Sequence, residues 1–212
     1  DAIAQAAPLA GFPAMCARTR ATLGAAVRLV FDHAFGGALI CIAEAEALHA
    51  TFGGAQAPWA PGGGEGRGLA GAGGEMDQLP FARSCDSNYM TGRLQGVHIS
   101  DARFGEAFGE FTRRDWSDRW PDDCPDEHAR GQPKDGAFLM SASGYRIKCA
   151  AKLMGLRCPT TWPNRGTRHE TALACAWNVA GAIVLVVSDA GSRHMVCRVG
   201  DSLQAWAMHQ VV

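Results

Sequence analysis

Residues 179–189 read VAGAIVLVVSD and contain the longest apolar run of the chain. The run is too short for a membrane-spanning helix, which requires about 20 apolar residues. Gly181 interrupts it, and the polar pair Ser188 and Asp189 ends it. Because polar and apolar residues do not alternate, the pattern predicts a strand over residues 183–187 that is buried on both faces. We therefore expect the core of the protein to form around this strand.

The length and charge of the chain restrict the classes of function. The 212 residues suffice for one well-filled core, with or without a small helical appendage. The chain has 20 lysines and arginines, 21 aspartates and glutamates, and a formal net charge of −1. Since the basic residues are scattered, neither nucleic acid nor a membrane surface is an expected partner. The sequence gives no indication of the oligomeric state.

The eight cysteines are spread along the chain without a Cys-x-x-Cys pair. This spacing disfavours a zinc-ribbon module, whose ligands come in close pairs. Two interpretations remain open: four disulfides in an oxidising compartment, or thiols buried as small apolar side chains. The sequence starts at Asp1 rather than at Met, which is typical of a chain whose targeting peptide has been removed. A secreted or periplasmic location is therefore expected.

The composition divides the chain into three parts. Residues 1–52 are rich in alanine and have apolar positions three and four apart, which predicts a helical N-terminal segment. Residues 53–74 contain ten glycines and two prolines, which predicts a flexible linker or an open loop. Residues 75–212 have a mixed, aromatic-rich composition and are expected to form the main domain.

The main domain is expected to be α+β, with a small antiparallel sheet and flanking helices. The spacing of Phe104, Phe108 and Phe111 predicts a helix within residues 101–120. Besides residues 183–187, short apolar runs predict strands over residues 137–142 and 173–177. Helices that precede strands along the chain favour an α+β arrangement over an alternating one.

Two short motifs and a late histidine carry a resemblance to a known family. Residues 143–146 read Ser-Gly-Tyr-Arg, residues 166–176 read GTRHETALACA, and His209 lies near the end. This series is similar to the D-alanyl-D-alanine carboxypeptidase and hedgehog-type zinc fold. The resemblance covers residues 138–212 at most. It implies a zinc-dependent hydrolase of cell-wall-type peptides, in which Arg146 binds the substrate and His169 and His209 bind zinc.

Zinc held by three protein ligands lowers the pKa of a bound water to about 7 and polarises the scissile carbonyl, while a carboxylate receives the proton. Two residues of the family pattern differ here. Ala176 stands where the family has its aspartate ligand, and Trp206 stands where it has its catalytic carboxylate. A second Arg-His pair ends at His194, and Asp201 follows it at the spacing of the family. Either histidine could thus belong to the site.

Two other functions remain as alternatives. The first is a non-catalytic, disulfide-stapled binding domain on a degenerate peptidase scaffold, which would account for Ala176 and Trp206. The second is a trypsin-like serine protease, because the surroundings of His49 and Ser202 resemble the segments around the catalytic histidine and serine of that family. His49, Asp101 and Ser202 would then form a triad, with the histidine as general base.

Overall fold

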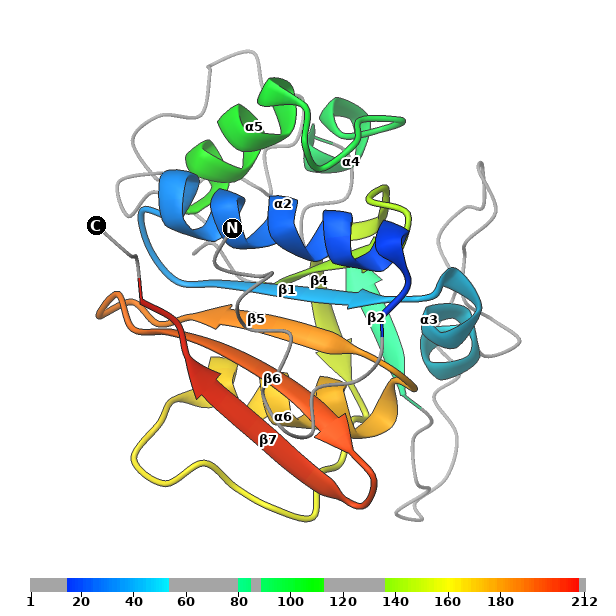
Figure 1. Cartoon of the computed structure of the whole chain (residues 1–212), viewed down its shortest axis with the longest axis vertical. Helices are drawn as coiled ribbons and strands as arrows, with labels where there is room; N and C mark the ends of the chain where they lie inside the picture. Colours follow the sequence, from blue (N-terminus) through cyan, green and yellow to red (C-terminus); the bar gives the residue numbers. More distant parts are fainter. Residues whose placement is uncertain (1–14, 54–79, 85–88, 113–135, 210–212) are drawn as a thin grey trace, which may run out of the picture.

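The computed structural model describes residues 15–53, 80–84, 89–112 and 136–209. Within these ranges the elements follow one another along the chain as α2 (Ala17–His33), β1 (Ala38–Ala43), α3 (Ala45–Phe52), β2 (Phe81–Ser84), α4 (Tyr89–Arg93), α5 (Ala102–Thr112), β3 (Ala137–Ser141), β4 (Arg146–Met154), α6 (Thr167–Asn178), β5 (Ile183–Val187), β6 (Arg193–Val199) and β7 (Ser202–Ala207). Figure 1 shows their arrangement. The α+β class expected from the sequence is confirmed.

The sheet has seven strands in the order β2-β4-β3-β1-β5-β6-β7. β1 and β3 are parallel, whereas the other neighbouring strands are antiparallel. The prediction of a small, purely antiparallel sheet was therefore wrong. The physical reason is the long connection between β1 and β3, which lets the chain return in the same direction, as a short hairpin turn cannot.

The central strand β1 lies inside the N-terminal segment for which only helices were predicted. All six of its residues, Ala38–Ala43, are buried. The prediction was correct for α2, but it missed β1 because six apolar residues show no period that separates a buried strand from a helix. The strand predicted over residues 183–187 is confirmed as β5, and β3 confirms the one over residues 137–142.

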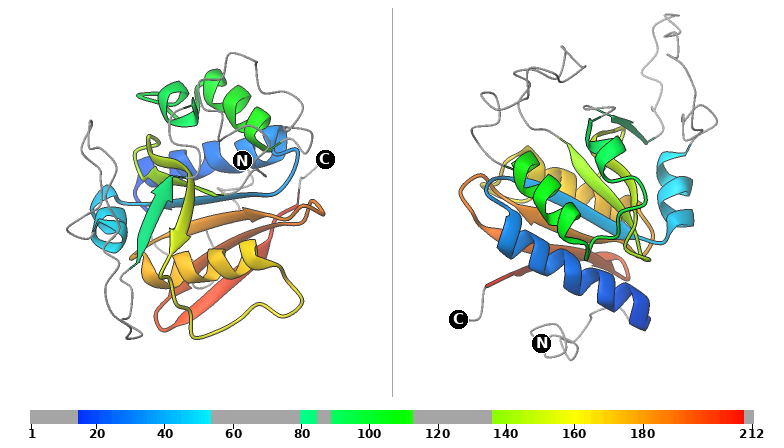
Figure 2. Two further views of the ribbon diagram at one scale, coloured as in Figure 1. Left: turned by 180° about the vertical axis from the view of Figure 1, so that it is seen from behind. Right: turned by 90° about the horizontal axis from the view of Figure 1, so that it is seen from above.

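Helices cover both faces of the sheet, as the two views of Figure 2 show. On one face, side chains of α2 and α5 form a single buried cluster with Ile40, Phe138 and Leu185. On the other face, α6 packs against Leu39, Val184 and Val196, whose side chains alternate with those of the first face. No helix in the described ranges combines the length and the apolarity that crossing a membrane requires.

The helix α6 replaces the strand that was predicted over residues 173–177. Buried positions Ala172, Leu173 and Ala176 lie three and four residues apart on the side that faces the sheet. Alanine has the highest helix propensity, and the small side chains let the helix approach the strands closely. The five residues 173–177, for which a strand was predicted, are too few to show this helical period.

The structure also limits two other predictions. The predicted helix over residues 101–120 is confirmed as α5 up to Thr112, while residues 113–120 lie outside the described ranges. Most of the glycine-rich linker, residues 54–74, lies outside them too.

The Ser-Gly-Tyr-Arg motif forms the β3–β4 turn, where Gly144 has a φ of +85° and a Cβ would collide with the ring of His98. Glycine is required there by both conformation and space.

The aromatic cluster on the α5 face yields a prediction about stability. Phe138 is fully buried, and its ring centroid lies 5.2 Å from Phe108 and 5.0 Å from Phe111. We expect Phe138→Ala to lower the free energy of unfolding by about 3–5 kcal/mol, because it leaves a cavity. Chemical denaturation measures this value. Phe81→Ala on the edge strand, 39% exposed, is the matched control and should cost less than about 1 kcal/mol. Equal losses for both variants would contradict this assignment of the core.

Candidate functional site

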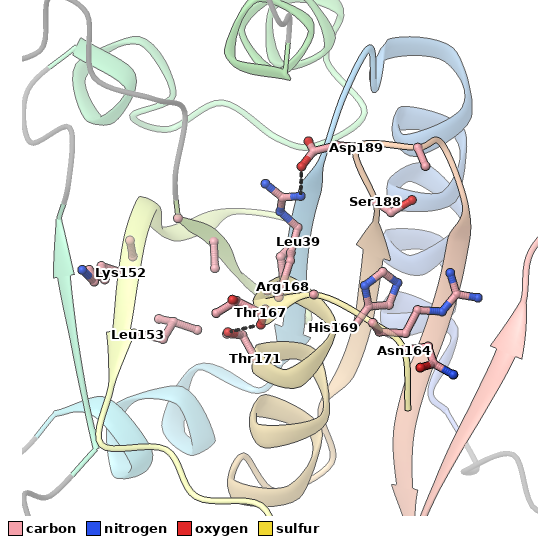
Figure 3. Close-up of a pocket in the computed structure, with 16 residues that line it drawn as sticks. Leu39, Lys152, Leu153, Asn164, Thr167, Arg168, His169, Thr171, Ser188 and Asp189 are labelled. Atoms are coloured by element: carbon pink, nitrogen blue, oxygen red, sulfur yellow. Dashed lines mark hydrogen bonds and ion pairs between the residues drawn. The ribbon is translucent and has the colours of Figure 1, made fainter. Parts of the chain in front are cut away.

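A cavity of about 570 Å³ lies at one end of the sheet, beside the start of α6 (Figure 3). Its walls come from the first residues of β1 and β3, the loop after β5, the middle of β4 and the first turn of α6. These segments meet because β1 and β3 are parallel and β5 runs against them, so that Ala38 pairs with Val187. The topology of the sheet therefore positions the cavity.

The N-terminus of α6 faces this cavity, and the N–H groups of His169 and Glu170 already bond to the carbonyl of Gly166. The N-cap Gly166 has an extended backbone and makes no side-chain hydrogen bond to the helix. The first N–H groups of any helix lack partners inside it, and the helix dipole adds partial positive charge at the same point. Gly166, Thr167 and Arg168 all line the cavity. A negatively charged ligand would be stabilised here.

Basic side chains surround the same end of the helix. Arg165 before the helix and Arg168 in its first turn line the cavity. The side chain of Lys152 on β4 points away from them (Figure 3), because its neighbours Ala151 and Leu153 belong to the face that α6 covers. Nη1 of Arg165 donates to Oγ of Ser192 at 3.3 Å, and Nη1 of Arg168 lies 3.2 Å from Oδ2 of Asp189. Two arginines thus meet one carboxylate in the described lining, which leaves an excess of positive charge.

Two buried histidines lie beside the cavity and pack on the same indole. His169 in the first turn of α6 is 3% exposed, and His194 at the start of β6 is 9% exposed. Their ring centroids are 5.4 Å apart, and each lies 5.0 Å from the ring of Trp162. Among the described residues, Nε2 of His169 and Nδ1 of His194 have no hydrogen-bond partner. Buried nitrogens of this kind are rare in cores and are typical of a site that receives a ligand.

Burial also changes the titration of both rings. It lowers the pKa of His169, and repulsion from the His194 ring when that is protonated, from Arg165 and from Arg168 lowers that pKa further. Burial likewise lowers the pKa of His194, with additional contributions from Arg165 and His209. Both imidazoles are therefore neutral at pH 7.

The remaining walls combine hydroxyl groups with apolar side chains. Thr167, Thr171 and Ser188 supply hydroxyls, and Oγ1 of Thr171 donates to the carbonyl of Thr167 at 2.9 Å. The apolar part is formed by residues of β1, β3 and β4, namely Leu39, Ala137, Ala151 and Leu153. One end of the cavity is thus cationic and polar, and the other is apolar.

The structure separates Arg146 from His169. Arg146 pairs with Met140, whose side chain belongs to the cluster under α2 and α5. Since directly paired residues of an antiparallel ladder point to the same face, Arg146 lies on the face opposite α6. His169, in contrast, is a buried residue of the first turn of α6 and lines the cavity.

His209 is exposed and follows β7, where the adjacent Met208 donates its backbone N–H to Arg193. The histidine that contacts His169 is His194 from the second Arg-His pair. Asp201 lies at the β6–β7 turn and pairs with Arg198 at 3.2 Å. Within the described ranges, no three His, Cys, Asp or Glu side chains gather as metal ligands would.

The residues of the alternative triad lie on different elements. His49 is on α3, which packs toward β2 and β3, and Ser202 starts the edge strand β7 at the other end of the sheet order. Asp101 precedes α5, and its carboxylate binds the guanidinium of Arg103 at 2.8 Å. The structure does not bring these three residues together.

Six described cysteines are thiols in the structure: Cys16, Cys41, Cys149, Cys158, Cys175 and Cys197. Cys85 and Cys124 lie outside the described ranges. Cys41 on β1 and Cys175 on α6 are both fully buried. Their mutual hydrogen bond, together with burial, raises the pKa of Cys175 well above its usual range. A framework in which all eight cysteines are bridged does not describe this structure.

Comparisons of the chain with protein-family models, with curated proteins and with solved structures found no match.

The sequence motif GTRH located one part of this site but not its neighbours. His169 was singled out as a metal ligand, whereas Arg165 and Trp162 were not connected to it. The available signal was Gly166 before the polar Thr167 and Arg168, since an uncapped glycine at the start of an alanine-rich stretch indicates an open helix N-terminus. Trp162 gives no such signal, because only the tertiary structure brings it against the rings of His169 and His194.

The two histidines yield a prediction about the pH dependence of stability. In the unfolded chain each binds a proton near pH 6.5, whereas in the folded protein each needs a lower pH. The unfolded state therefore binds more protons below about pH 6.5, and stability falls as the pH decreases. We expect His194→Phe to reduce the loss of Tm between about pH 7.5 and pH 5.5. His49→Gln, at an exposed position of α3, should leave that loss unchanged. Parallel pH profiles of wild type and His194→Phe would contradict the prediction.

Proposed function

We propose that the protein binds a nucleotide in this cavity, with the phosphate groups at the N-terminus of α6. The observation that carries the proposal is the buried Nε2 of His169, which has no partner within the described ranges and lies beside an uncapped helix N-terminus and two arginines of the cavity lining. Backbone N–H groups, a helix dipole and guanidinium groups all favour the oxygens of a phosphate.

The size of the cavity favours a ligand larger than an inorganic anion. At about 570 Å³ it falls within the range of about 300–1,000 Å³ that is typical of small-molecule sites. A single phosphate at the helix N-terminus would leave the part between Leu39 and Leu153 empty. That part offers apolar surface to the flat face of a base, and Thr171 and Ser188 offer hydroxyls to a sugar.

The same groups support a class of reaction. Arginine side chains and a helix N-terminus stabilise negative charge that develops on phosphate oxygens during transfer. We therefore favour phosphoryl or nucleotidyl transfer from the bound nucleotide over simple storage of it. In an incubation with adenosine triphosphate and Mg²⁺ alone, water is the acceptor. ³¹P NMR would then identify phosphoryl transfer from adenosine diphosphate and phosphate, and nucleotidyl transfer from adenosine monophosphate and pyrophosphate.

The zinc-peptidase hypothesis receives less support from the described residues. Arg146, which would bind the substrate, lies on the opposite face of the sheet from His169. Ala176 and Trp206 supply no carboxylate, and Ala176 is fully buried on the side of α6 that faces the sheet. The trypsin-like alternative lacks an assembled triad, as described above.

The nucleotide proposal predicts the effect of neutralising the basic groups. We expect Arg165→Gln and Arg168→Gln each to weaken the binding of adenosine triphosphate by about three- to tenfold, because each removes one charge-assisted contact of roughly 1 kcal/mol. Isothermal titration calorimetry measures the Kd. Arg18→Gln is the control: it removes the same charge at an exposed position of α2, on the other side of the sheet.

Two outcomes would contradict the proposal. The first is a wild-type protein that binds neither adenosine nor guanosine triphosphate at millimolar concentration. The second is a set of three variants that all bind as the wild type does, since the binding site would then lie elsewhere.

A further inference from the structure

One of the arginines in the cavity wall, Arg168, forms an ion pair. Oδ2 of Asp189, in the loop after β5, lies 3.2 Å from Nη1 of Arg168. The other oxygen of the same carboxylate accepts the backbone N–H of Gly37 at 3.1 Å. Figure 3 shows this pair at the rim of the cavity, above Thr167 and Leu39. Asp189 is the one carboxylate among the described lining residues.

The position of Arg168 makes this pair relevant to a bound anion. Arg168 is the second residue of α6, next to the N–H groups that would contact a phosphate, and its side chain is one-quarter exposed. Guanidinium groups bind carboxylates and phosphates through the same planar N–H donors. A phosphate at the helix N-terminus and Asp189 would therefore compete for one guanidinium.

We propose, on the basis of the nucleotide site above, that Asp189 is a specificity-determining residue that competes with the ligand for Arg168. In the ligand-free protein Asp189 holds the guanidinium, and a phosphate has to displace the carboxylate in order to bind. Displacement requires a ligand with more negative charge than a carboxylate. The site thereby rejects weakly charged anions and accepts polyphosphates.

A purely structural role of Asp189 would have the opposite effect on binding. If the carboxylate served only to hold Arg168 and the start of β1 in place, its removal would disorder the site and weaken the binding of anions. If it competes, its removal releases Arg168 and also removes a like charge from the cavity, which strengthens binding. The sign of the change in affinity therefore separates the two roles.

The decisive variant is Asp189→Asn, which keeps an oxygen that can accept the Gly37 N–H but removes the charge. We expect this variant to bind adenosine triphosphate about three- to fivefold more tightly than the wild type, as for the loss of a competing ion pair whose carboxylate is 61% exposed. Inorganic phosphate, used as a second probe, should gain in the same direction. Calorimetric titrations at fixed ionic strength measure both values.

The matched control is Asp201→Asn. Asp201 also forms an ion pair at 3.2 Å, with Arg198, and it is fully exposed at the β6–β7 turn away from the cavity. The variant changes the net charge by the same amount, so it should bind within about twofold of the wild type if long-range electrostatics contribute little. An equal gain in both variants would overturn the proposal, because the effect would then come from net charge alone.

A double variant tests whether the gain passes through Arg168. In an Arg168→Gln background, Asp189→Asn should raise the affinity by less than half as much as it does in the wild type, since the two side chains share one interaction. An undiminished gain would overturn the competition for Arg168.

The failures of the two proposals are distinguishable. Unchanged or weaker binding by a folded Asp189→Asn variant, while the wild type binds adenosine triphosphate, overturns the role of Asp189 and leaves the nucleotide site intact. Absence of binding by both proteins overturns the nucleotide site itself. Far-ultraviolet circular dichroism and Tm values compare the folding of the variants.

Discussion

The pairing of β1 on both of its edges is the constraint on which the rest of the fold depends. Its backbone pairs with β3 on one side and with β5 on the other, and its side chains are buried under helices on both faces. A strand in this position has no access to water, so every backbone N–H and C=O must pair and every side chain must be apolar. The sequence ALICIA meets both requirements.

The candidate site is a consequence of the directions in which these strands run. Because β1 and β3 start at the end of the sheet where β5 stops, Leu39, Ala137 and Ser188 come together from distant parts of the chain. α6 returns from β4 to β5 across one face, and its N-terminus arrives at the same end. The helix could not be shifted along the sheet without exposing Ala172 and Ala176, so its packing also fixes where its dipole points.

The two buried histidines are less favourable for stability than apolar side chains would be at the same positions. An apolar side chain at position 169 or 194 would fill the space next to Trp162 without burying a ring nitrogen that lacks a partner among the described residues. Burying an unpaired polar group costs roughly 1–3 kcal/mol in proteins. Two such groups, next to an uncapped helix N-terminus and two arginines, disfavour a purely structural role and agree with a site prepared for an anion.

The sequence by itself determined the α+β class, the buried strand over residues 183–187, and the helices over most of residues 17–33 and 102–112. These features depend on local apolar patterns, which a linear sequence displays directly. It could not determine that β1 is central, that β1 and β3 are parallel, or that residues 173–177 are helical, because short apolar runs satisfy either conformation. Only the tertiary structure placed Arg146 on the opposite face from His169, packed His194 against His169 and brought Asp189 to the cavity. The physical reason is that strand pairing and helix packing join residues that are far apart along the chain. Their separation in the sequence therefore does not indicate their distance in space.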